Sequence, residues 1–143
     1  MGTIKKFLFP KRMTDNAFSL LILVARIIFG TLLLNHGIGK WMNVENASLT
    51  FPDPLGIGST FSLSLVIFAE VFCSIGFILG ALYRLCLIPM IITLAVAFFI
   101  IHSGDAFAVK ELALMYLITF ILLFIAGPGQ FSVDAAIRNT IMK

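Results

Sequence analysis

Four long apolar segments constrain the fold of this chain more than any other feature. Each approaches or reaches the roughly 20 residues with which an α-helix crosses the ~30 Å hydrocarbon core of a membrane. With 60% hydrophobic and 12% charged residues, the chain has too little polar surface to face water on all sides. The segments are also too long and too uniformly apolar for the strands of a membrane β-barrel. We therefore expect an all-α membrane protein, with four transmembrane helices in an antiparallel bundle, at about residues 18–36, 61–82, 85–102 and 106–126.

The connections between the segments differ in length. Only Tyr83 and Arg84 separate the second and third segments, and residues 102–105 separate the third and fourth, so we expect tight turns there. The first connection is longer, from about residue 35 to residue 60. Two prolines and two glycines within Phe51–Gly58 exclude a helix and favour a turn-rich loop. Two readings stay open for this loop: a lid over the mouth of the bundle, or a plain connector.

The C-terminal part predicts a short fifth helix. Gly127, Pro128 and Gly129 end the fourth segment, and Ser132 is a suitable N-cap for a helix that follows. Apolar residues then recur at helical spacing beside two cations, which suits a helix lying at the membrane interface. We find no internal repeat, so residues 1–143 are expected to form one domain.

The distribution of Lys and Arg predicts the orientation. We expect the first segment to be a retained span rather than a cleaved signal peptide, because no small-residue cleavage site follows it. With both termini in the cytoplasm, only Lys40 and Lys110 fall on the outer side. The net charge of +3 then reflects topology and contact with anionic lipid, not nucleic-acid binding. The cations on the cytoplasmic side are Lys5, Lys6, Lys11, Arg12, Arg84, Arg138 and Lys143.

A charge inside the first span demands a partner. Arg26 lies within an apolar run, where a guanidinium costs at least ~2.5 kcal/mol unless it is satisfied inside the bundle. Glu70 of the second span is within its estimated reach if the two helices are neighbours. We expect these two side chains to pair directly or through water, with backbone carbonyls or water alone as the alternatives.

Other polar residues gather in the outer half of the predicted bundle. His36, Lys40, Glu70, His102 and Glu111 come from four different spans. They can form a pocket, roofed by the 51–58 loop and lined by Phe, that supplies hydrogen-bond donors and proton carriers to a quinone headgroup. Alternatively, they only contact lipid headgroups or lock helices together. The sequence contains no metal-site pattern.

Cys73 and Cys86 are the only cysteines. They do not form a C-x-x-C motif, so we expect them to act as small buried apolar residues rather than as a redox pair.

The pattern of polar residues and glycines resembles the DoxX family of small four-helix bacterial membrane proteins. The resemblance covers the chain from about Arg26 to Asp134. The residues that carry it are Arg26, Gly30, His36-Gly37-x-x-Lys40, Glu70 to Gly80, Arg84, His102, Glu111 and Gly127-Pro128-Gly129-x-x-Ser132-x-Asp134. It implies a multi-pass protein of the bacterial inner membrane that is associated with redox chemistry, since the family takes its name from a subunit of a thiosulfate:quinone oxidoreductase.

The most specific functional prediction is therefore a membrane subunit of a quinone-linked oxidoreductase, with quinone as its cofactor and with redox proteins or a second copy as partners. Arg26, His36, Lys40, Glu70, His102 and Glu111 are the candidate ligand-binding residues. Other classes stay open: a non-catalytic scaffold, a haem protein with His36 and His102 as axial ligands, and a small-solute transporter.

Overall fold

The computed structural model describes residues 13–141 and has four helical spans, as expected. Five of the cations that predict the orientation lie outside the described residues: Lys5, Lys6, Lys11, Arg12 and Lys143. The second and third spans each include a π-helical segment. The spans are α2 (Asp15–Met42); α4 (Ser59–Ile67), η1 (Phe68–Phe72) and α5 (Cys73–Leu79); α6 (Tyr83–Val96) and η2 (Ala97–Ile101); and α7 (Phe107–Ala126). Two shorter helices are α3 (Val44–Thr50) and α8 (Val133–Ile141).

The first span is longer than predicted. Helix α2 does not end near residue 36 but continues to Met42, and α3 follows, so the irregular part of the first connection starts only at Phe51. Gly37 and Gly39 both lie inside this helix, and Gly37 allows close packing against the second span. A Cβ at Gly37 would lie 2.7 Å from the Cβ of Glu70, so α2 and η1 approach more closely there than any larger residue allows.

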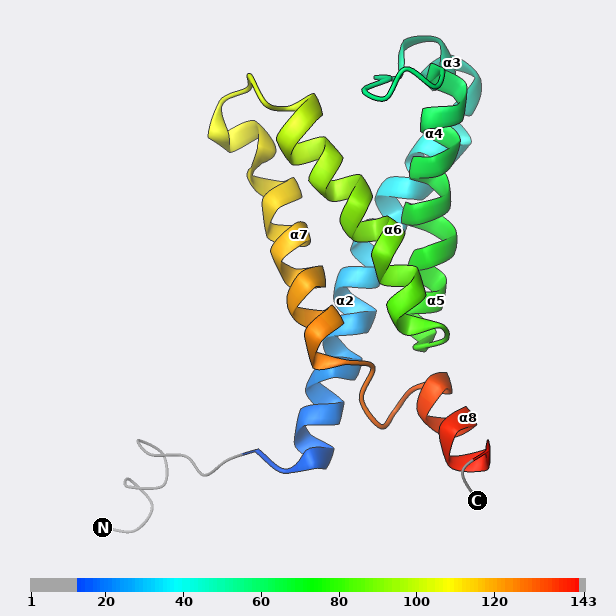
Figure 1. The fold of residues 1–143 in the computed structure, drawn as a ribbon, viewed down its shortest axis with the longest axis vertical. Coiled ribbons are helices and arrows are strands. Elements are labelled where there is room, and N and C mark those ends of the chain that lie inside the picture. The colour runs from blue at the N-terminus through cyan, green and yellow to red at the C-terminus, as the bar shows by residue number, and fades with distance from the viewer. Residues whose placement is uncertain (1–12, 142–143) are drawn as a thin grey trace, which may run out of the picture.

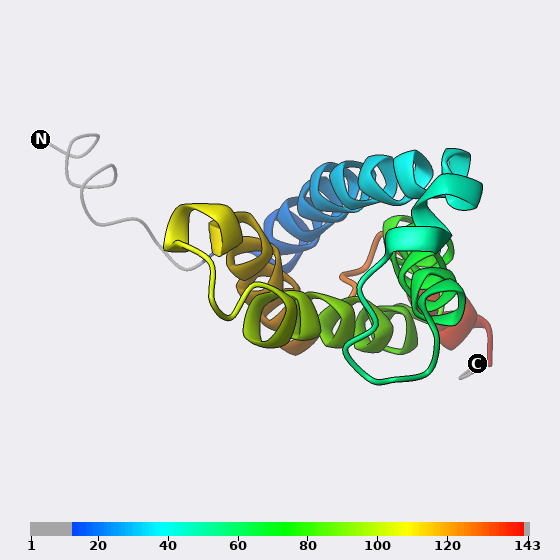
Figure 2. The ribbon, with the colours of Figure 1, turned by 90° about the horizontal axis from the view of Figure 1, so that it is seen from above.

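The spans form an open ring of neighbours. Helix α2 packs along η1 and α5, α5 packs along α6, and α6 packs along α7. Contacts between α7 and α2 are few, and Figure 1 shows why: α6 and α7 lean away from α2 and α4 toward the end that carries α3. Seen from above, α2 lies on one side of the bundle and α6 on the other (Figure 2). The bundle is therefore tight at the α8 end and splayed at the loop end.

The tight end contains an aromatic core. Phe77 stacks on Tyr83, with ring centroids 5.5 Å apart, and meets Phe120 edge to face. The Tyr83 hydroxyl donates a 2.9 Å hydrogen bond to the carbonyl of Leu123, which satisfies its buried polar group. Large apolar side chains are exposed along all four spans, as a lipid-facing surface requires.

Candidate functional site

A cavity of about 510 Å³ lies under the 51–58 loop, bordered mainly by α4 and α6. Its size is typical of small-molecule sites, roughly 300–1,000 Å³. Most of its wall is apolar, with few polar side chains. It is lined by Lys40, Phe51, Pro52, Pro54, Leu55, Ile57, Ser62, Leu65, Val66, Phe68, Glu70, Pro89, Ile92, Thr93, Val96, Ala97, Ile101 and His102.

An ion pair at the wall of the cavity joins two spans. The Nζ of Lys40, in the last turn of α2, lies 2.5 Å from Oε2 of Glu70 in η1. The Glu70 side chain is only 9% exposed, whereas that of Lys40 is 32% exposed. A carboxylate buried this deeply is costly unless it is paired. Lys40 therefore balances the charge of Glu70, and both residues line the cavity.

The two π-helical segments border the same cavity. In η1 the amide of Cys73 bonds to the carbonyl of Phe68, and in η2 the amide of His102 bonds to the carbonyl of Ala97. Such π turns are rare and often occur at functional sites. The extra residue in each turn changes the direction of the side chains near it. These segments thus place Glu70 and His102 beside one cavity.

The roof of the cavity is held by one carboxylate. Asp53 accepts hydrogen bonds from the amide of Gly58 at 2.7 Å, the amide of Ile57 at 3.0 Å and the hydroxyl of Ser62 at 2.8 Å. The amide of Gly58 is the main reason why the pKa of the Asp53 carboxyl is lowered, and the Ser62 hydroxyl acts in the same direction. Asp53 therefore ties the loop to the first turn of α4.

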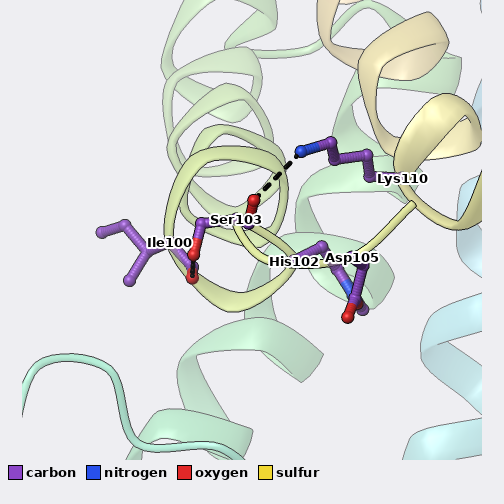
Figure 3. A network of polar contacts seen from close by, with 5 residues as sticks. All are labelled: Ile100, His102, Ser103, Asp105 and Lys110. Atoms are coloured by element: carbon purple, nitrogen blue, oxygen red, sulfur yellow. Dashed lines mark hydrogen bonds and ion pairs between the residues drawn. The ribbon is translucent and has the colours of Figure 1, made fainter. Parts of the chain in front are cut away.

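His102 lies in the turn between η2 and α7, where α6 and α7 meet at the loop end (Figure 3). Its Nδ1 lies 2.6 Å from Oδ2 of Asp105, and the ammonium of Lys110 donates to the carbonyl of Ser103 at 3.3 Å. These contacts fix the turn and engage one ring nitrogen of His102. The other nitrogen, Nε2, is the one available to a ligand.

Three of the six candidate residues do not line the cavity: Arg26, His36 and Glu111. His36 is exposed on α2, with its ring edge to face against Tyr116 at 6.2 Å between centroids. Glu111 is exposed in the second turn of α7, and neither residue lines the cavity. Of the five outer residues, the structure thus brings together Lys40, Glu70 and His102. Phe lines the cavity only at Phe51 and Phe68.

Arg26 serves the opposite end of the bundle, so the expected pairing with Glu70 is wrong. Its guanidinium is buried and donates to four backbone carbonyls. Two of them, at 3.0 and 2.6 Å, belong to Phe77 and Ile78 at the end of α5, and two, at 2.9 and 2.8 Å, belong to Pro128 and Phe131. The C-terminal end of a helix is the negative end of its dipole, which suits a cation.

The C-terminal segment completes this clamp. The carboxylate of Asp134 accepts hydrogen bonds from the backbone amides of Leu82 and Tyr83, each at 2.9 Å. The backbone amide of Asp134 donates to the carbonyl of Gly80. Gly80 has φ of +68°, and a Cβ there would lie 2.6 Å from the guanidinium of Arg26. Arg26 and Asp134 therefore anchor residues 128–134 beneath the turn between α5 and α6.

Sequence reasoning missed the hydroxyls of Ser62 and Thr93 at the cavity and the role of Asp53 in its roof. The available signal was weak, because isolated Ser and Thr residues are common in membrane helices and usually bond to their own backbone. Asp53 stood out only as an acid between two prolines.

Comparison with known proteins agrees with this architecture. The DoxX family model matches residues 21–103. Inner membrane protein YqjF of Escherichia coli (strain K12) is 34% identical over 123 residues, which cover 82% of this chain and 92% of that protein. No solved structure gives a significant match.

Proposed function

The chain belongs to the DoxX family of multi-pass inner membrane proteins, and from that premise we propose that it is a membrane subunit of a quinone-linked oxidoreductase whose cavity binds the quinone headgroup. The observation that carries the proposal is the Lys40–Glu70 ion pair at the wall of an otherwise apolar cavity of about 510 Å³. A ring with two carbonyl oxygens requires this combination of apolar walls and a few donors.

The surroundings of the cavity favour a ligand that arrives from the bilayer. Leu65, Phe68 and Ile92 line it and are also 44%, 50% and 57% exposed, so the cavity reaches the lipid-facing surface between α4 and α6. An isoprenoid tail can remain among the lipid chains there while the headgroup enters. A water-soluble substrate would instead have to pass the apolar roof formed by the loop.

The lining residues can supply hydrogen bonds and protons. The Lys40 ammonium can donate to a carbonyl oxygen of the quinone, and Nε2 of His102 can do the same from the side of η2 in the imidazolium form, in which both ring nitrogens donate. Glu70, already paired with Lys40, can hold a proton and return it as the charge of the ligand changes. A bound quinone supplies the chemistry of accepting two electrons and two protons.

A thermal-shift experiment tests the proposal. A short-chain quinone analogue should raise the Tm of the purified chain in detergent, because a ligand that binds only the folded state stabilises it by mass action. Lys40→Met and His102→Ala should each reduce that ligand-induced shift. His36→Ala and Glu111→Gln are matched controls, polar residues of the same membrane half that do not line the cavity, and should leave the shift intact.

Absence of any shift in the wild type would overturn the quinone site and favour the scaffold function. Equal loss in the cavity variants and in the two controls would show that the shift does not report on this cavity.

A further inference from the structure

The two cysteines, distant from any redox motif in sequence, meet in the structure. Cys73 begins α5 and is 4% exposed, and Cys86 lies in the first turn of α6 and is half-buried. The sulfur of Cys86 sits over Gly76, where a Cβ would be 2.5 Å from it. Since Cys73 and Gly76 are three residues apart on one helix, they share a face, and the sulfur of Cys86 lies near both. The two thiols are close enough to interact with each other.

Gly76 explains why the two helices approach so closely here. With no side chain at that position, the Cβ of Cys86 comes within 3.8 Å of the Cβ that Gly76 would carry. Disulfides need Cα atoms roughly 4.4–6.8 Å apart, and the missing side chain at Gly76 lets α5 and α6 approach closely at this level. The Cys86 thiol donates to the carbonyl of Ala81 at 3.6 Å, which leaves its sulfur lone pairs for Cys73.

The pair lies directly beyond the inner wall of the cavity. Cys73 follows Glu70 by three residues and Cys86 precedes Pro89 by three, and both Glu70 and Pro89 line the cavity. The thiols are therefore about one helical turn, or ~5 Å, below these lining residues. Cys73 is buried among apolar neighbours, whereas Cys86 is partly exposed, so an oxidant can reach the pair through Cys86.

We propose that Cys73 and Cys86 are a redox-active dithiol that is oxidised by quinone. Two S–H bonds break and one S–S bond forms between α5 and α6, while two electrons and two protons pass to the quinone, which becomes a quinol. The identity of the oxidant rests on the proposed function. The dithiol supplies the two-electron couple that the chain otherwise lacks, because its sequence has no flavin, nicotinamide or metal motif.

Counting free thiols on the purified full chain tests this proposal. Reduced protein is exposed to diamide or to a short-chain quinone analogue, denatured, and labelled with maleimide-polyethylene glycol. We expect two labels before oxidation and none after either oxidant, with the quinone converted to quinol in equal amount. Cys73→Ala and Cys86→Ser should each keep their single label, and their melting curves verify that they fold.

A relocated cysteine provides the matched control. Cys86→Ser with Ile88→Cys keeps one thiol on each helix but moves the second to a side chain that is 43% exposed to lipid. This variant should retain both labels under conditions that remove them from the wild type. Equal loss would mean that oxidation is not specific to the observed pair.

Different outcomes of these experiments would overturn different parts of the proposal. Two labels retained after diamide would overturn the dithiol, and labels lost with diamide but not with quinone would overturn quinone as the oxidant. The quinone-induced Tm shift of the variant lacking both thiols tests the cavity alone. We expect that shift to persist, and its absence there and in the wild type would overturn the proposed function instead.

Discussion

Arg26 shows how a single buried charge can be satisfied without a counter-charge in contact. Its planar guanidinium has five donors in a fixed geometry, and four carbonyls from two segments accept from it. Lys has a single point of charge and cannot reach four acceptors in this way. The residue therefore acts as a structural clamp at the tight end of the bundle, separate from the cavity.

Replacing Arg26 should destabilise the fold strongly. Arg26→Gln leaves buried carbonyls unsatisfied and should lower the free energy of unfolding by on the order of 3 kcal/mol, measured by denaturant titration in detergent. Its effect should add to that of Glu70→Gln within about 0.5 kcal/mol, since the two residues share no partner. Lys40→Met and Glu70→Gln, by contrast, should be non-additive. Strong coupling between Arg26 and Glu70 would contradict the clamp.

Ser74 offers a prediction of the opposite sign. Among residues 13–141, its hydroxyl is the one buried side-chain group that lacks a hydrogen-bond partner. Ser74→Ala removes that unsatisfied group and should raise the free energy of unfolding by about 1 kcal/mol. Ser62→Ala is the matched control, because it removes a hydroxyl bonded to Asp53 and should lower stability. A loss of stability in Ser74→Ala would show that the hydroxyl has a partner, such as a buried water.

At the scale of elements, the 51–58 loop should respond to acid. The pKa of Asp53 is lowered in the folded state, so its contribution to loop stability is present above the ordinary Asp pKa of about 3.9. That contribution is lost as the pH falls through the lowered folded-state pKa. Hydrogen exchange at the amides of Ile57 and Gly58, compared with Asp53→Asn at each pH, should show protection that disappears only in this acidic window. Protection that is the same in Asp53→Asn at neutral pH would contradict the role of Asp53.

Local chemistry predicted some elements well and others poorly. Pro and Gly correctly marked the 51–58 loop and the end of α7 at Gly127, because these residues act on their own backbone. The extension of α2 was missed because Gly37 looks like a helix breaker unless its packing against η1 is known. The π-helical segments were missed because nothing in the apolar pattern distinguishes them from α-helix.

The candidate site depends even more on such tertiary detail. Gly30 lies against Phe77 and Ile78, and Gly37 lies against Glu70, which fixes the register between α2 and the second span. With this register, Arg26 reaches the carbonyl of Ile78 and Lys40 reaches the carboxylate of Glu70. The depth of each residue, counted from the ends of its span, indicates that α2 and the second span can be neighbours but does not show which of their side chains pair. Likewise, the sequence separation of Cys73 and Cys86 did not reveal that the α5–α6 hairpin brings them together.

At the scale of the whole molecule, the distribution of cations predicts that both ends face the cytoplasm. The described start of α2 and the whole of α8 lie at one end of the bundle, opposite α3 (Figure 1). In a background of Cys73→Ala and Cys86→Ser, Ser48→Cys and Asn139→Cys should therefore react with an impermeant maleimide from opposite sides of the membrane. Only Ser48→Cys should react in intact cells with a permeable outer membrane. Reaction of both from one side would refute the topology.

The two π-helical segments also affect how the sequence of such a chain can change during evolution. A π turn holds one more residue than the α turn that it replaces, so each five-residue segment is equivalent to an α-helix with a single-residue insertion. Deleting one residue within Phe68–Phe72 would convert the π turn to an α turn, keep the direction of the helix on either side, and change where the side chains of the segment point, Glu70 among them. The Arg26 clamp, on the far side of the insertion, would keep its register. Small insertions and deletions at these two points can thus reshape the cavity in related chains without rebuilding the bundle beneath it.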